Sequence, residues 1–209
     1  MSLVRKVRAV EREFRHLDKE IATFQEASGL RCLSGCGKCC FNAKIEATPL
    51  EFLPYALALF REGQAEQVWE DLKTNSRPSC AMLRPMLAST DAGFCTQYEY
   101  RGMVCRLFGY SAMRNKHGER ALYTCKLVKE NQPQTFAEAE QAIKGTLNVP
   151  VVSDWYRRLS AIDSNLGGKL FPINQAITVA LEEVMHYYAY RKPPRPMGST
   201  APRKPRKAS

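Results

Sequence analysis

Four of the eight cysteines in the chain lie within nine residues, in the segment Cys32-Leu-Ser-Gly-Cys36-Gly-Lys-Cys39-Cys40. The other four occur singly in the part of the chain that follows, as Cys80, Cys95, Cys105 and Cys125. Thiolates act as nucleophiles, redox groups and soft metal ligands. Eight cysteines therefore indicate metal ligation or thiol chemistry, and all eight are candidate metal ligands.

Two kinds of thiol chemistry fit parts of this segment. Cys36-Gly-Lys-Cys39 is a C-x-x-C motif, as in thiol–disulfide redox sites, but that motif normally lies where a strand runs into a helix. Cys32, Cys36 and Cys39 have the C-x3-C-x2-C spacing of radical enzymes that present an open iron to S-adenosylmethionine. Such enzymes are built from repeated strand–helix units, which this sequence does not show. Neither chemistry accounts for Cys40 and the four later cysteines.

A closed metal site accounts for more of the pattern. Eight thiols divide into two tetrahedral zinc sites of four ligands each, although zinc modules usually supply their cysteines as close pairs. A short loop completed by remote cysteines is typical of an iron–sulfur cluster. Neighbouring Gly35 and Gly37 allow the backbone to bend around the sulfurs. We favour an iron–sulfur cluster over zinc, and adjacent Cys39 and Cys40 then serve two metals or leave one thiol spare.

Composition places the chain among globular proteins. Its 209 residues are 44% hydrophobic and 25% charged, which is enough to bury a core without disulfides. The N-terminal residues are charged and do not resemble a signal peptide, and no apolar run reaches the length of a membrane span. We therefore expect a cytoplasmic protein, in which disulfides are disfavoured.

The net charge of +10 is concentrated at the C-terminus. Residues 192–209 hold six basic residues and five prolines, with no acidic residue, which predicts a disordered basic tail. Such a tail can make weak, non-specific contact with nucleic acid or an anionic surface, or can simply keep the protein in solution.

Residues 3–24 show a heptad pattern, with apolar residues at alternating steps of four and three. The pattern predicts an N-terminal helix that ends at Ser28-Gly29. The seam either packs within the chain or joins two chains in a homodimer. It consists of Leu3, Val7, Val10, Phe14, Leu17, Ile21 and Phe24.

The remaining patterns predict a mainly α fold with a small β hairpin element, an α+β protein whose cysteine-rich loop lies between helices. Thr48-Pro-Leu-Glu51 is a capping box, and Thr135-Phe-Ala-Glu138 predicts another helix start. The hairpin is predicted from strands at 106–114 and 120–128, with Ala121, Tyr123, Cys125 and Leu127 on the inward face. A last helix is expected after Phe171-Pro172.

Four parts of the chain follow from these patterns. They are the N-terminal heptad helix (1–29), the cysteine-cluster metal-binding region (30–130), C-terminal helices of the same domain (131–191) and the disordered basic tail (192–209).

The cysteine pattern resembles the YkgJ-type family of zinc- or iron-chelating proteins, whose hallmark is C-x-x-C-x-x-C-C. Cys32, Cys36, Cys39 and Cys40 match that cluster with one additional residue in the first spacing. Residues 95–109 resemble the second block of the family, Cys-x-x-Tyr-x-x-Arg-Pro-x-x-Cys-Arg-x-Phe-Pro, with Gly102 and Gly109 in place of its prolines. The resemblance implies an eight-cysteine metal site.

The resemblance leaves three functions open. The cysteines hold an iron–sulfur cluster for electron transfer, sensing or structure; or zinc stabilises a module that binds a protein partner; or the cluster serves a protein-modifying enzyme. The last alternative arises because flagellin lysine N-methylase, a relative, carries a similar cysteine set. No glycine-rich S-adenosylmethionine motif supports methyl transfer here, and the catalytic residues and substrate stay unknown.

Overall fold

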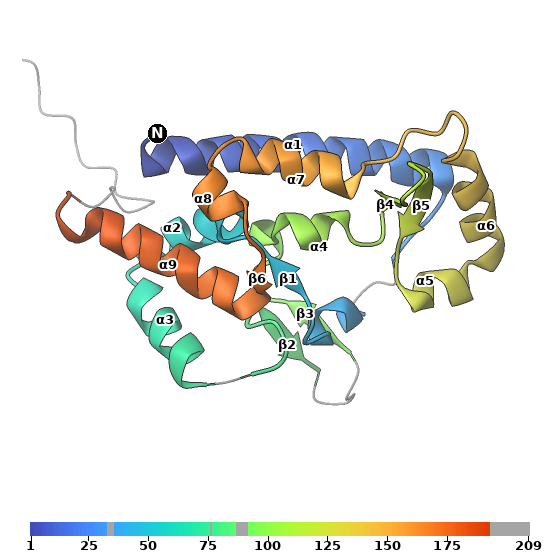
Figure 1. Cartoon of the computed structure of the whole chain (residues 1–209). Coiled ribbons are helices and arrows are strands. Elements are labelled where there is room, and N and C mark those ends of the chain that lie inside the picture. The colour runs from blue at the N-terminus through green and yellow to red at the C-terminus, as the bar shows by residue number, and fades with distance from the viewer. Residues whose placement is uncertain (33–35, 76, 87–91, 193–209) are drawn as a thin grey trace, which may run out of the picture.

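The computed structural model of the chain describes residues 1–32, 36–75, 77–86 and 92–192. Helices dominate it, and the longest described helix, α1 (Leu3–Ser28), runs along one side of the molecule (Figure 1). The predicted mainly α class with a small β element is confirmed. The other α-helices are α2 (Leu53–Arg61), α3 (Ala65–Thr74), α4 (Met103–Leu107), α5 (Lys126–Asn131), α6 (Pro133–Ala142), α7 (Val152–Ser160), α8 (Ser164–Gly167) and α9 (Ile173–Ala189).

The described strands form three small antiparallel pairs. Of these pairs, β1–β6 joins the two strands that lie furthest apart in the sequence. It links the segment after the cysteine loop to the start of α9. The pairs are β1 (Glu46–Ala47) with β6 (Phe171–Pro172), β2 (Leu83–Pro85) with β3 (Gly93–Cys95), and β4 (Ser111–Arg114) with β5 (Arg120–Tyr123). Strand β3 ends at Cys95, and β5 ends two residues before Cys125.

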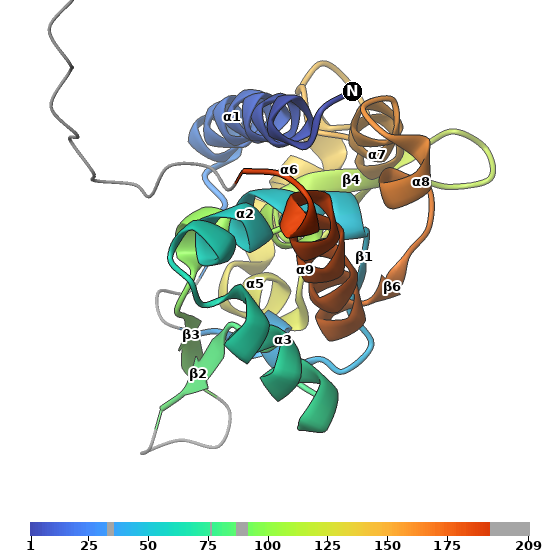
Figure 2. The ribbon, with the colours of Figure 1, turned by 90° about the vertical axis from the view of Figure 1, so that its left-hand side faces the viewer.

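The heptad seam of α1 packs inside the chain. All seven seam residues are at most 8% exposed, and the helix ends at Gly29 in a left-handed conformation, as predicted. Helix α1 contacts α2, α4, α6 and α7, and Figure 2 shows α7 beside α1 and α2 below it. A homodimer through this helix stays a prediction, and it would have to use the outer, polar face.

Alanine at Leu17 tests how much the buried seam contributes. Leu17 is 0% exposed, so Leu17→Ala should lower the free energy of unfolding by about 2–5 kcal/mol. Exposed Lys19 is the control, and Lys19→Ala should change the free energy of unfolding by about 0.5 kcal/mol or less. Denaturant melts at two protein concentrations provide the measurement. If the denaturant concentration at the unfolding midpoint of the wild type rises with protein concentration, association of chains contributes to the stability instead.

Thr48 and Glu51 form the predicted capping box, with one difference. The box opens a 3-10 turn, η2 (Pro49–Phe52), which leads directly into α2. Both residues are buried, and the Glu51 carboxylate accepts hydrogen bonds from the backbone N–H and the hydroxyl of Thr48. Burial raises the pKa of Glu51. The local motif therefore also places a carboxyl group at the centre of the fold.

The predicted hairpin is present but shorter than expected. Its turn at residues 115–119 is confirmed, whereas residues 103–107 form α4 and the second strand ends at Tyr123. The prediction that Ala121 lies on the inward face of the second strand is wrong, because Ala121 is exposed and its neighbour Leu122 is buried. Cys125 lies beyond the strand and precedes α5 as its N-cap residue.

One further helix start differs from the prediction, and another is confirmed. The helix expected to begin at Thr135 begins at Pro133, because proline is favoured in the first turn of a helix. The helix expected after Phe171-Pro172 is confirmed as α9. No helix within the described ranges is long and apolar enough to cross a membrane.

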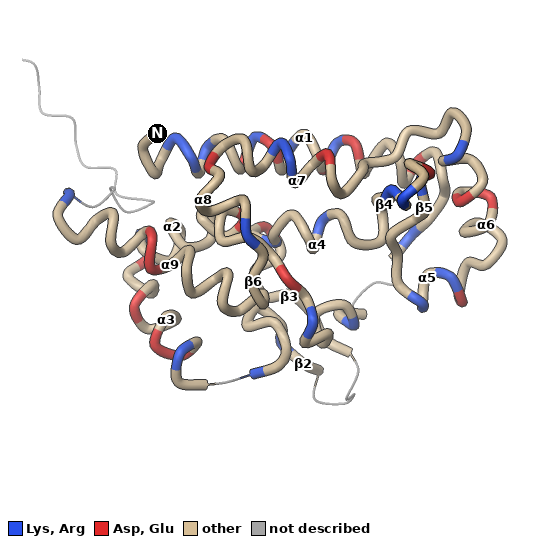
Figure 3. Tube along the Cα trace, viewed as in Figure 1, with Lys and Arg blue, Asp and Glu red and all other residues tan. Residues whose placement is uncertain are grey.

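Acidic and basic residues are mixed along the described chain (Figure 3). Both signs occur along α1, and acidic residues occur on α3 and α9. The predicted basic tail lies outside the described residues except for Lys192, so its contact with nucleic acid or an anionic surface stays a prediction.

Candidate metal centre

The second half of the cysteine loop packs directly against the segment that carries Cys95. Cys39 and Cys40 lie on the 3-10 turn η1 (Lys38–Phe41), which follows Gly37 in a left-handed conformation with φ 56°. A Cβ atom at Gly37 would lie 2.3 Å from the carbonyl oxygen of Gly93 on β3. Only glycine therefore permits this approach, and it brings η1 beside the strand that ends at Cys95.

Cys80 is held beside the same turn. Its backbone N–H donates a hydrogen bond of 3.1 Å to the carbonyl oxygen of Cys40. The side chain of Asn174, at the start of α9, accepts a hydrogen bond from the N–H of Ala81 and donates one to the carbonyl oxygen of Ser79. Register in the β2–β3 pair then places Cys95 opposite Leu83, three residues after Cys80.

Cys105 reaches the group from α4. The carboxylate of Glu51 accepts a hydrogen bond of 3.0 Å from the backbone N–H of Val104, next to Cys105. A Cβ atom at Gly102 would lie 2.8 Å from an oxygen of that carboxylate, so glycine at this position lets the start of α4 lie close to Glu51. At the other end of the helix, buried Arg106 pairs with Asp18 on α1. These contacts fix the position of Cys105.

The thiols of these five cysteines influence one another electrostatically. The Cys39 and Cys40 sulfurs lie 3.9 Å apart, and a hydrogen bond from Cys40 lowers the pKa of Cys39 to about 6. The same bond, followed by burial, raises the pKa of Cys40. Burial is also the main cause that raises the pKa of Cys80, to about 11, and those of Cys95 and Cys105. Cys39 is thus the thiol most easily ionised in this group.

Arg101 supplies a positive charge to the group. Its guanidinium favours the thiolate forms of Cys39, Cys95 and Cys105 and so acts to lower their pKa values. It stacks on the ring of Tyr98, with 3.5 Å between the guanidinium carbon and the ring centre. A cation beside several thiolates offsets their mutual repulsion, as a thiolate-rich metal site requires.

The three other cysteines lie at different places. Cys32 is exposed, and its N–H donates a hydrogen bond of 2.6 Å to the hydroxyl of Tyr110. The neighbouring N–H of Arg31 donates to the side chain of Gln132, between α5 and α6. Cys36 is half-buried, and half-buried Cys125 precedes α5. Residues 33–35 of the loop, including Gly35, lie outside the described residues.

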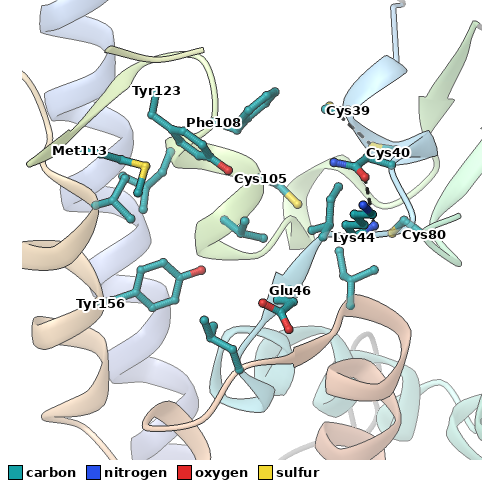
Figure 4. Close-up of a pocket in the computed structure, with 17 residues that line it drawn as sticks. Cys39, Cys40, Lys44, Glu46, Cys80, Cys105, Phe108, Met113, Tyr123 and Tyr156 are labelled. Carbon is teal, nitrogen blue, oxygen red and sulfur yellow. Dashed lines mark hydrogen bonds between the residues drawn. The ribbon is translucent and has the colours of Figure 1, made fainter. Parts of the chain in front are cut away.

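The donor set fits a metal that prefers sulfur. Cys39, Cys40, Cys80, Cys95 and Cys105 come from η1, the turn before β2, β3 and α4, and four of them line one pocket (Figure 4). Within the described ranges, no group of three or more histidine, cysteine or acidic side chains is already arranged around one point as metal ligands are. The eight-cysteine ligand set therefore stays a prediction.

Sequence patterns missed several residues that position the cysteines. Glu51 was visible only as a helix cap, although its carboxylate also holds α4. Asn174 carries a weak signal, since it is a polar residue at the start of an otherwise apolar helix. Tyr156 hydrogen-bonds the Glu51 carboxyl group. Because Tyr156 lies within an amphipathic helix, nothing in the sequence indicates that it makes this contact. All three act across long separations in the sequence.

Comparisons with known proteins show the family of the chain. Searches of curated proteins and of solved structures find no match. Residues 31–141, more than half of the chain, match the model of the CxxCxxCC family, described as "Putative zinc- or iron-chelating domain". The matched region contains all eight cysteines, and the resemblance predicted from their spacing is confirmed. The chain therefore belongs to the CxxCxxCC family.

Proposed function

We propose that this protein holds an iron–sulfur cluster through thiolates of its cysteine group. The observation that carries the proposal is that Cys39, Cys40, Cys80 and Cys105 line one cavity. Cys95, on a fourth segment, and Arg101 are close enough to interact electrostatically with Cys39. Thiolate ligands are preferred by zinc and by iron–sulfur clusters, and less by harder cations. Bound there, a cluster would supply one-electron chemistry and would link the four segments covalently.

Two features favour an iron–sulfur cluster over zinc. The cysteines of the group come from a tight turn and from single remote positions, which is typical of cluster ligation, whereas structural zinc sites usually use two close pairs. With Cys39 as a thiolate ligand, the Cys40 thiol also donates the hydrogen bond that joins the two sulfurs. Hydrogen bonds to the sulfurs are one means by which proteins tune a cluster's potential. In this arrangement Cys39 is a ligand and Cys40 supports it.

Anaerobic purification of the full chain tests the cofactor. We expect a brown protein with visible absorbance, and iron and acid-labile sulfide in equal amounts. Elemental analysis on the same sample measures zinc. A colourless protein that contains zinc and no sulfide would overturn the iron–sulfur proposal while leaving metal chelation in place. Protein that binds neither metal after reconstitution would overturn both.

A zinc-stabilised interaction module is the second candidate. Three large apolar side chains near Cys95 are exposed, at 48% for Met86, 49% for Phe94 and 63% for Tyr98. Exposed apolar residues that gather on one surface are typical of protein-binding sites. The same elemental analysis separates this candidate from the first, because it requires zinc without sulfide.

A further inference from the structure

A cavity of about 420 Å³ adjoins the cysteine group. Cys39, Cys40, Cys80 and Cys105 line one part of it, and aromatic side chains line another (Figure 4). A metal ion bound by thiolates needs little more than the space between sulfurs about 2.3 Å from it. Cavities that bind small organic molecules measure roughly 300–1,000 Å³. The cavity therefore has room for a molecule beside a metal centre.

The walls away from the cysteines are mostly apolar. They come from α4, the β4–β5 hairpin, α7 and α9, and include Leu107, Phe108, Val152 and Ile173. The hydroxyl groups of Tyr123 and Tyr156 point into the space between these walls (Figure 4). The Tyr156 hydroxyl bonds the buried Glu51 carboxylate. Tyr123 then provides the hydroxyl that is better placed to bond a ligand.

The cavity opens to solvent beside two exposed apolar side chains. Met113 and Leu170, both lining residues, are 50% and 49% exposed. Lys44 and Glu46, also exposed lining residues, contribute one charge of each sign. Large apolar side chains at the opening of an apolar cavity favour an apolar ligand. A net charge on the ligand would be costly to bury among these walls.

We propose that this cavity binds a small neutral organic molecule, with an apolar body the size of one or two rings and one carbonyl or hydroxyl group that hydrogen-bonds Tyr123. The ligand lies against the wall that carries Cys105, so it would be in reach of a metal held there. That last step rests on the proposed metal centre, whereas the binding itself does not.

Fluorescence of prodan, a neutral naphthalene ketone, tests the proposal with the full chain. We expect saturable binding of one prodan per chain with a blue-shifted emission, in both metal-loaded and metal-free protein. Val152→Trp places a large side chain in the cavity and should weaken binding about tenfold or more. Tyr123→Phe keeps the ring but removes the hydroxyl, and should weaken binding roughly two- to tenfold.

Two exposed large side chains provide a control that does not touch the core. Met113→Glu puts a charge at the opening and should weaken prodan binding about fivefold or more. Tyr190→Glu changes an exposed aromatic side chain that does not line the cavity, and should leave binding unchanged. Circular dichroism and metal content of each variant check its fold and its metal centre separately.

Three results would overturn the proposal. Binding that does not saturate, or that is equal in all variants, would mean that prodan adheres to the surface. Binding to metal-free protein alone would mean that the metal centre itself fills the cavity. A different result would separate this proposal from that of the metal centre. If the chain takes up no metal but binds prodan at this site, the cavity proposal stands and the metal proposal fails.

Discussion

Replacing Cys105 by serine should remove most of the bound metal and lower the stability of the loaded protein. Cys105 lies on α4, where Glu51 and Arg106 hold the helix in place, so no other cysteine can replace it without moving the backbone. A metal that binds only the folded chain stabilises it by about 4 kcal/mol at a concentration 1,000 times its Kd. Loss of this ligand should remove stabilisation of that order.

The measurement compares loaded and metal-free protein. Elemental analysis gives the metal content, and thermal unfolding gives the stability of each form. In the metal-free form serine is nearly the same size as cysteine, so Cys105→Ser should cost only about 1 kcal/mol there. A large loss of stability in the loaded form with a small loss in the metal-free form identifies Cys105 as a metal ligand. Equal losses of stability in both forms would indicate that Cys105 has a packing role.

Cys125→Ser is the matched control, because Cys125 lies at the start of α5 and outside the group of five cysteines. If that group alone forms the centre, this variant should keep its full metal content. If the eight cysteines divide into two sites of four, which is one of the arrangements that the sequence leaves open, it should lose about half. Cys105→Ser protein with the metal content of the wild type would contradict the assignment of Cys105 as a ligand.

Much of the fold is encoded in local patterns and was predictable. The heptad steps of Leu3 to Phe24 place every seam residue on one face, and the structure buries that face. Thr48 and Glu51 mark a helix start by their spacing alone. The hairpin turn at 115–119 is likewise local. In each case the residues that decide the structure lie within a few positions of one another.

The strand boundaries depend on contacts that no local pattern contains. Residues 103–107 are apolar enough to continue a strand, yet the Glu51 carboxylate, far earlier in the chain, bonds the N–H of Val104 at the start of α4. The short helix α5 then begins at Lys126, so Cys125 precedes a helix and does not lie on a strand face. Tertiary hydrogen bonds override the intrinsic strand propensity of these residues.

The candidate site shows the same division. Cysteine spacing was sufficient to mark Cys39, Cys95 and Cys105 as candidates. It could not show which cysteines meet, because that depends on the approach of Gly37 to Gly93 and on the bond from Cys80 to Cys40. Both contacts involve backbone atoms, whose pairing leaves almost no trace in residue types.

Alanine at Gly37 should therefore damage the metal centre without touching a cysteine. Gly37 has a φ of 56°, and its missing side chain allows the carbonyl of Gly93 to approach. An alanine Cβ would lie 2.3 Å from that oxygen and 2.7 Å from its carbon, so η1 must move away from β3. That movement separates Cys39 from Cys95. We expect a loss of about 2–4 kcal/mol in stability and a metal affinity at least about tenfold weaker.

Gly63 is the matched control for the backbone conformation. It follows α2 with a φ of 72°, also left-handed, and nothing lies within 4 Å of a Cβ added there. Gly63→Ala therefore carries only the conformational cost, about 1–2 kcal/mol, and should leave metal affinity unchanged. Chelator competition measures the affinity and denaturant melts of metal-free protein measure the stability. Equal effects of the two substitutions on both quantities would show that the contact of Gly37 with Gly93 does not position the cysteines.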